Sequence, residues 1–234
     1  YGRPELFHTI GIAEREVFAD RSKNLEMKLY AYRRILSNLR KNYPNAPMLI
    51  ASWDFYYPGW SGEEIAKLLT QLNPENTIIF DYTSDLPSKK ENTHFENWGV
   101  VGKFPWIFGI FHAYEWENEL RGYYDAIKER MPIAAKDPMC KGFVYWPENS
   151  HSDPFMLEFF THNAWNPNIL TPEELLPGFC GDRYGTEASV MQEAWNAAFP
   201  IIKLPDDLPP EYREIATFSK QEITPERIQN YRDR

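Results

Sequence analysis

The stretch Pro105-Trp106-Ile107-Phe108-Gly109-Ile110-Phe111-His112 decides the predicted fold of this 234-residue chain. A short, continuous apolar run that is rich in β-branched and aromatic residues is typical of a strand buried in a parallel sheet. Four other runs have the same character and are bounded by Pro, Gly, Asn or Asp: residues 6–12, 48–51, 77–80 and 143–146. The sequence therefore predicts five strands, the fourth at residues 106–111.

Helical patterns separate these strands. Apolar residues that step by four, three, four and three predict one buried helix face, which runs from Leu25 to Leu39. Ser61 followed by Glu64 forms a capping box and predicts a helix that ends near Leu72. Two further helices are predicted, at residues 119–129 and from the Asp153-Pro154 pair to about residue 162.

Strands that alternate with helices at this spacing predict an α/β fold with a parallel sheet. A complete (β/α)8 TIM-type barrel needs about 250 residues, so five strands would form only part of one. We expect residues 1–170 to be the C-terminal part of a barrel, with an open doubly wound sheet as the alternative. Residues 171–234 contain a capped start at Thr171-Pro172, a helical pattern at 187–198 and a Pro-rich, charged tail. They predict a helical appendage with a partly mobile end.

Composition narrows the classes of partner. The formal charge of -9 argues against a nucleic acid or an anionic membrane, which call for a basic face. Aromatic residues make up 16% of the chain, which fits either a large aromatic core or rings that stack on sugars. Cys140 and Cys180 could form one disulfide or stay free.

Several well-known motifs are missing from the sequence. It has no P-loop, GxGxxG, GxSxG, HExxH or CxxC, which argues against nucleotide-binding, lipase and metalloprotease chemistry. We therefore expect neither a cofactor nor a metal. The chain begins at Tyr1 without a signal peptide, and we expect a processed protein or an excised fragment. Its expected location is secreted or periplasmic, or lysosomal in a eukaryote.

Acidic and aromatic residues follow every predicted strand. Because the carboxyl ends of parallel strands carry the chemistry of such folds, these residues predict one rim around a site. They are Glu14 after the first strand, Trp53 and Asp54 after the second, Asp81 after the third, His112 and Tyr114 after the fourth, and Trp146 and Glu148 after the fifth.

This arrangement favours the hydrolysis of a glycoside, which uses two carboxyl groups on either side of the scissile bond. Glu14 and Glu148 are the first choices because each follows an apolar strand. Other interpretations stay open for both residues. Glu14 could belong to a solvated charge cluster with Arg15 and Glu16, and Glu148 could cap a loop.

The remaining rim residues also have structural alternatives. Asp54 and Asp81 could cap loops, and His112 could be a hydrogen-bonded interior histidine. Asp153 could form a metal pair with His151, although an N-cap explains it better.

The order of segments over about residues 1–185 resembles glycoside hydrolase family 89, the α-N-acetylglucosaminidases. Residues 49–55 resemble its strand that ends in Gly-Trp-x-Phe, and residues 77–82 resemble its next strand, which ends in Leu-Asp. Residues 105–112 are similar to its Pro-Phe-Ile-Trp-x-x-x-His segment. Residues 145–148 are similar to its Ala-Pro-Glu-Gly, and residues 183–185 resemble an Arg-Tyr-Gly that follows its barrel.

The resemblance implies an eight-stranded barrel core, retaining hydrolysis and α-linked N-acetylglucosamine as substrate. It implies that Glu148 is the nucleophile and Glu14 the acid/base, with Trp53 and His112 lining the sugar subsite. Two neighbours depart from the family pattern: Ala13 replaces an Asn, and Asn149 replaces a Gly. A non-catalytic carbohydrate-binding protein on the same fold is therefore the alternative.

Overall fold

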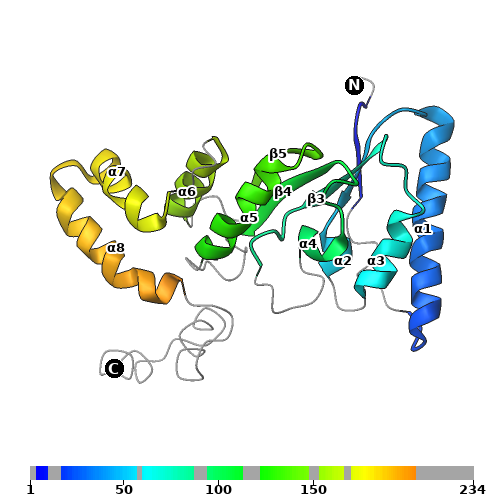
Figure 1. The fold of residues 1–234 in the computed structure, drawn as a ribbon, viewed down its shortest axis with the longest axis horizontal. Helices are drawn as coiled ribbons and strands as arrows, with labels where there is room; N and C mark the ends of the chain where they lie inside the picture. Colours follow the sequence, from blue (N-terminus) through cyan, green and yellow to red (C-terminus); the bar gives the residue numbers. More distant parts are fainter. Residues whose placement is uncertain are drawn as a thin grey trace. The chain divides into compact units, whose positions relative to one another are not determined.

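Five strands form one sheet in the first part of the chain (Figure 1). The computed structural model describes residues 4–9, 17–56, 60–86, 94–112, 122–147, 153–165 and 170–203. In these residues the strands follow the chain in the order β1-β2-β3-β4-β5. Their bounds are β1 Phe7–Thr9, β2 Met48–Ala51, β3 Thr77–Asp81, β4 Trp106–His112 and β5 Cys140–Pro147.

The strand order distinguishes the two predicted architectures. The first three neighbouring pairs are parallel, with registers such as Ile50 opposite Ile79. A doubly wound sheet reverses its strand order at a switch point, whereas the strands of a (β/α) barrel stay in chain order. The described sheet has no reversal, so it is part of a TIM-type barrel, as the strand spacing predicted.

The strand positions are largely as predicted. β2 has the predicted bounds, and β3 and β4 each extend one residue further. β5 is longer than predicted because it begins at Cys140, three residues before the apolar run. Of the predicted first strand, residues 7–9 are found and residues 10–12 lie outside the described part of the chain.

The long helices of this part follow their sequence signals. α1 (Arg21–Asn42) buries Leu29 and Tyr32 on the predicted face. α3 (Gly62–Leu69) begins with the predicted capping box: Ser61 N donates to the Glu64 carboxylate over 2.7 Å, and Glu64 N donates to Ser61 Oγ over 3.3 Å.

Three helices differ from the sequence prediction. α5 (Tyr124–Lys136) runs seven residues beyond the predicted end, because Met131 and Ala134 continue the buried face that begins at Tyr124. Two single-turn helices, α2 (Trp53–Tyr56) and α4 (Phe95–Trp98), lie where the sequence predicted no helix.

The chain divides into two compact units, which we describe separately. Among the described residues, the second unit comprises 112, 122–123, 147, 153–160 and 170–203. Its helices include the first part of α6 (Pro154–Trp165), α7 (Pro172–Tyr184) and α8 (Ala188–Ile202), with the 3₁₀ turn η1 (Gly185–Glu187) before α8. The predicted boundary between a barrel part and an appendage at residue 170 stays a prediction.

Local signals also start the helices of the second unit. Thr171 and Glu174 form a complete capping box ahead of α7. Asp153 caps α6, since its Oδ1 accepts a hydrogen bond of 2.9 Å from Met156 N. The core of this unit is aromatic, with Phe155, Phe179, Trp195 and Phe199 at centroid distances of 4.9–6.1 Å.

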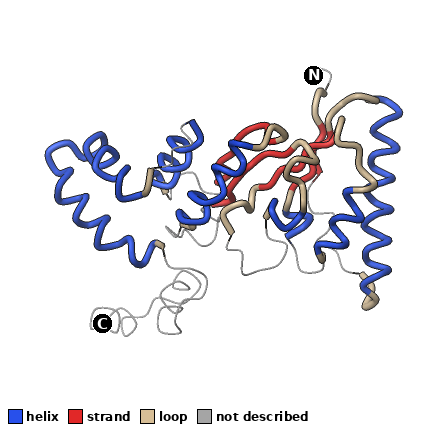
Figure 2. The backbone as a smooth tube through the Cα atoms, viewed as in Figure 1, coloured by secondary structure: helices blue, strands red, loops and turns tan. Residues whose placement is uncertain are grey.

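The strands of the sheet are red in Figure 2. The side chains on its two faces form separate clusters. On one face Trp106 and Phe108 are fully buried and contact the ring of Phe95 in α4. A separate apolar cluster lies on the other face of the sheet, and its buried residues are Leu49, Ala51, Phe80 and Tyr82. The half-buried side chains packed against this cluster are Trp53, Ile78, Ile107, Phe111, Val144 and Trp146. The second face therefore carries three half-buried aromatic side chains, Trp53, Phe111 and Trp146.

None of the helices in the described ranges is long and apolar enough to cross a membrane.

Candidate functional site

Four aromatic side chains meet at the carboxyl ends of β2 to β5. They come from the first residue of α2, from the residue after β3, and from the ends of β4 and β5: Trp53, Tyr82, Phe111 and Trp146. We call this group the aromatic rim. Trp53 and Trp146 are site residues predicted from the sequence, and the structure places both of them against Tyr82.

Tyr82 is the centre of the aromatic rim. Its ring is stacked with Trp53 at a centroid distance of 6.3 Å and an interplanar angle of 13°. Its centroid lies 5.6 Å from that of Phe111 and 5.4 Å from that of Trp146. Tyr82 is only 3% exposed, whereas the other three rings are half-buried. Half-buried rings offer flat apolar faces that suit the C–H faces of sugars.

Tyr82 and Phe111 are not among the site residues predicted from the sequence. The alternation of side chains along a strand could have predicted them. Tyr82 lies on the same face of the sheet as Phe80, and Phe111 lies on the same face as Ile107.

Asp54 has a buried partner in α1. Its Oδ2 accepts a hydrogen bond of 2.5 Å from the hydroxyl of Tyr32, and neither side chain is exposed. Burial, together with the nearby Asp54 carboxylate, raises the pKa of Tyr32 well above its usual value. Sugar contact by Asp54 stays a prediction, and in this structure the carboxylate links α1 to α2.

Asp81 holds the loop after β3. Its Oδ1 accepts hydrogen bonds from the backbone N–H and the hydroxyl of Thr83, at 2.9 and 3.1 Å. Its Oδ2 accepts one of 2.7 Å from Phe95 N. Burial raises the pKa of Asp81 to about 7, against the opposing effect of these hydrogen bonds. The loop-capping alternative therefore describes its contacts, and sugar binding by Asp81 stays a prediction.

Arg130 of α5 also binds residues that follow β3. Its Nη1 donates to the carbonyl oxygens of Ser84 and Leu86, both at 2.5 Å, and its Nε lies 3.4 Å from Glu96. Burial, together with the charge of Arg130, lowers the pKa of the neighbouring His94 to about 4. Described residues on either side of 87–93 are thus bound by the buried side chains of Asp81 and Arg130.

His112 belongs to the second unit, where it pairs with Asp153. His112 Nε2 lies 2.9 Å from Asp153 Oδ2, and the two residues are 4% and 3% exposed. Because Asp153 also caps α6, one carboxylate serves both the helix and the imidazole. Asp153 is thus the predicted N-cap. The structure gives His112 the hydrogen bond expected of an interior histidine, and sugar contact by this residue stays a prediction.

Three of the predicted site residues lie outside the described residues: Glu14, Tyr114 and Glu148. Glu148 directly follows β5, and Glu14 stands five residues beyond the end of β1. Their roles, like the substrate contacts of Trp53 and Trp146, stay predictions.

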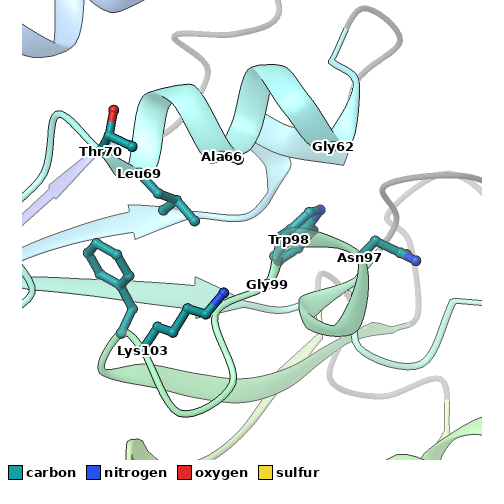
Figure 3. A pocket seen from close by; sticks show the side chains of 9 residues that line it. Gly62, Ala66, Leu69, Thr70, Asn97, Trp98, Gly99 and Lys103 are labelled. Carbon is teal, nitrogen blue, oxygen red and sulfur yellow. The ribbon is translucent and has the colours of Figure 1, made fainter.

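A groove of about 430 Å³ lies elsewhere in the first unit, between α3 and the segment from α4 to β4 (Figure 3). Ala66 and Leu69 line it from α3, and Trp98, Lys103 and Phe104 line it from the other side. It contains none of the predicted site residues. In the described part of the chain, no group of three or more His, Cys, Asp or Glu side chains could hold a metal.

Two solved structures share the fold of this chain. One is a double variant of CpGH89 from Clostridium perfringens in complex with its substrate GlcNAc-alpha-1,4-galactose, with 16% identity and a TM-score of 0.56 over 79% of this chain and 19% of that one. The other is a family 89 glycoside hydrolase from Clostridium perfringens in complex with 2-acetamido-1,2-dideoxynojirmycin, with 18% identity and a TM-score of 0.58 over 81% of this chain and 20% of that one. This chain therefore spans about a fifth of each.

Sequence comparison identifies the family. No curated protein matches the chain. The model of the alpha-N-acetylglucosaminidase (NAGLU) tim-barrel domain matches residues 1–167, which is more than two thirds of the chain and contains the sheet and the aromatic rim. The chain therefore belongs to the alpha-N-acetylglucosaminidase tim-barrel family.

Proposed function

We propose that this chain is part of a retaining exo-glycosidase that removes an α-linked N-acetylglucosamine or a related hexoside. The family match over residues 1–167 carries the proposal. The aromatic rim supports it, because half-buried rings at the carboxyl ends of barrel strands suit a sugar.

In the proposed reaction, the sugar ring lies against the exposed faces of Trp53 and Trp146. Glu14 donates a proton to the oxygen of the leaving group while Glu148 attacks the anomeric carbon and forms a glycosyl-enzyme. Glu14 then takes a proton from water as the water displaces Glu148. Two inversions give retention of the anomeric configuration, which requires carboxyl groups about 5–5.5 Å apart.

The test is Glu148→Gln in the protein at its full natural length, with Glu129→Gln on the exposed side of α5 as control. Turnover of an aryl α-N-acetylglucosaminide should fall at least about a thousandfold for Glu148→Gln and stay unchanged for the control. Wild-type turnover by Glu148→Gln would remove Glu148 from its proposed role.

The stereochemistry is a separate test. Proton NMR of the first product should show the α-anomer before mutarotation, and the β-anomer would indicate inversion. In Glu14→Gln, added azide should restore turnover and yield a glycosyl azide, since azide attacks a glycosyl-enzyme without help from a base.

The second candidate is a carbohydrate-binding protein without turnover on the same fold. The replaced neighbours of the two glutamates, Ala13 and Asn149, favour it. It predicts that N-acetylglucosaminides quench tryptophan fluorescence and are not hydrolysed. Trp146→Ala should weaken binding under either candidate, so turnover distinguishes the two.

A further inference from the structure

Helix α1 carries a charge opposite to that of the whole chain. It contains seven Lys and Arg residues and one Glu, a formal charge of +6, in a chain whose formal charge is -9. An acidic chain thus contains a strongly basic helix, and Figure 1 shows this helix at the edge of the first unit.

Four of the seven cations have partners within the unit, and one of them, Arg33, donates over 3.2 Å to the Leu29 carbonyl oxygen of its own helix. Arg21 forms a bidentate pair with Glu64 at 2.7–2.9 Å. Lys28 is 3% exposed and lies 5.0 Å from the ring centroid of Trp60. Arg40 donates to backbone carbonyl oxygens beyond the end of the helix. These four contribute to the stability of the unit.

The other three, with one aromatic residue, form a line. Lys23, Tyr30, Arg34 and Lys41 are all exposed, and Tyr30 is 63% exposed. At 3.6 residues per turn they point in the same direction to within about 20°, over a length of about 27 Å. We call these four residues the α1 stripe. Among the described residues, no carboxylate lies within ion-pair distance of its three cations.

We propose that the α1 stripe binds a linear acidic polysaccharide, with carboxylate or sulfate groups at its three cations and a sugar face on Tyr30. Charge complementarity supports an anionic ligand. The stripe residues are aligned along the helix axis, which fits an extended polysaccharide. An aromatic ring between cations suits sugar rings that alternate with anionic groups. A nucleic acid is disfavoured because it calls for a broad basic face, and the formal charge of the whole chain is -9.

The choice of a glycan as the ligand rests on the proposed function. The position of the binding surface rests only on the exposed side chains of α1. The stripe would hold an acidic glycan on the outside of the barrel unit, on a helix that carries none of the rim residues.

The experiment measures the binding of fluorescein-labelled dextran sulfate to the full chain, with neutral dextran as the reference. The variant is Lys23→Gln/Arg34→Gln/Lys41→Gln. The matched control is Lys67→Gln/Lys103→Gln/Lys128→Gln, which removes the same charge from three exposed lysines on other elements.

The stripe variant should bind dextran sulfate at least about tenfold more weakly than the wild type, and the control should bind within about twofold. Tyr30→Ala should also weaken binding, and the dependence of affinity on salt should become shallower only in the stripe variant. Equal losses in the two triple variants would overturn the proposal, since they would indicate a diffuse charge effect. Tighter binding to an oligonucleotide or to phosphatidylserine vesicles, or a stripe-dependent dimer without polysaccharide, would also overturn it.

Failure of this proposal can be distinguished from failure of the proposed function. Dextran sulfate binding involves no turnover, and the stripe variant should hydrolyse a small aryl glycoside as the wild type does. Loss of turnover in Glu148→Gln leaves the binding measurement unaffected.

Discussion

The hydroxyl of Tyr32 in α1 donates a hydrogen bond of 2.5 Å to Oδ2 of Asp54 in α2, and both side chains are fully buried. The two residues are 22 positions apart in sequence. Their bond fixes the single-turn helix that presents Trp53 to the aromatic rim.

Removing this donor should destabilise the first unit. Tyr32→Phe leaves a buried carboxylate with one donor fewer, which should lower the free energy of unfolding by about 1–3 kcal/mol. Urea denaturation followed by fluorescence measures the change. Tyr30→Phe removes the same hydroxyl from an exposed position of the same helix and should have no measurable effect. Equal effects of the two substitutions would show that the bond to Asp54 does not stabilise the fold.

Asp81 should make stability depend on pH. Its pKa is about 7 when folded and near the ordinary value of 3.8 when unfolded, so the folded state holds the proton more tightly. The resulting stabilisation is complete below about pH 4 and is lost as the pH rises through 7. The urea midpoint of Asp81→Asn, measured from pH 4 to 8, should therefore fall less with pH than that of the wild type.

The comparison for Asp81 uses the slopes of the urea midpoint against pH. A loss of stability that is the same at every pH, such as one from altered hydrogen bonds, does not change these slopes. Asp125→Asn, an exposed position of α5, should follow the wild-type curve. Parallel curves for Asp81→Asn and the wild type would contradict a raised pKa in the folded protein.

The double role of Asp153 can be separated by substitution. Asp153→Ala removes both the cap of α6 and the partner of His112, and should lower the free energy of unfolding by about 1–3 kcal/mol. Asp153→Asn keeps a capping oxygen and should cost less. Asp182→Ala, at an exposed position of α7, is the control and should be close to neutral. A cost for Asp153→Asn equal to that of Asp153→Ala would assign the stabilisation to the carboxylate charge.

Gly109 should not tolerate a side chain. A Cβ at this position of β4 would lie 2.9 Å from the carbonyl oxygen of Asp81 and 2.9 Å from Cε2 of Phe80. Gly109→Ala should therefore lower the free energy of unfolding by about 1–3 kcal/mol.

The matched control for Gly109 is Gly178→Ala in α7, where a Cβ would meet no atom within 4 Å. It should raise stability by up to about 1 kcal/mol, because Ala favours a helix more than Gly. Thermal unfolding of the two variants should give shifts of opposite sign. A neutral Gly109→Ala would mean that β3 and β4 can move apart to accept the methyl group.

Much of the fold could be predicted from local sequence. The apolar runs predict the strands because they are short and nearly free of polar residues. The capping residues predict where helices begin, because their hydrogen bonds join residues only three positions apart. The end of α5 could not be predicted this way, because the helix continues through Pro132 on the strength of buried contacts.

The sequence by itself determined the strands, the capped helices, the family segments and the presence of acids and rings after each strand. Tertiary structure decided the rest, because strand order and side-chain partners depend on contacts between distant segments. Adjacent Asp81 and Tyr82 differ in this way: the Asp81 carboxylate accepts hydrogen bonds from Thr83 and Phe95, and the Tyr82 ring joins the aromatic rim. Alternation along a strand separates the two side chains, and only the packing of the sheet determines which face is covered and which is accessible.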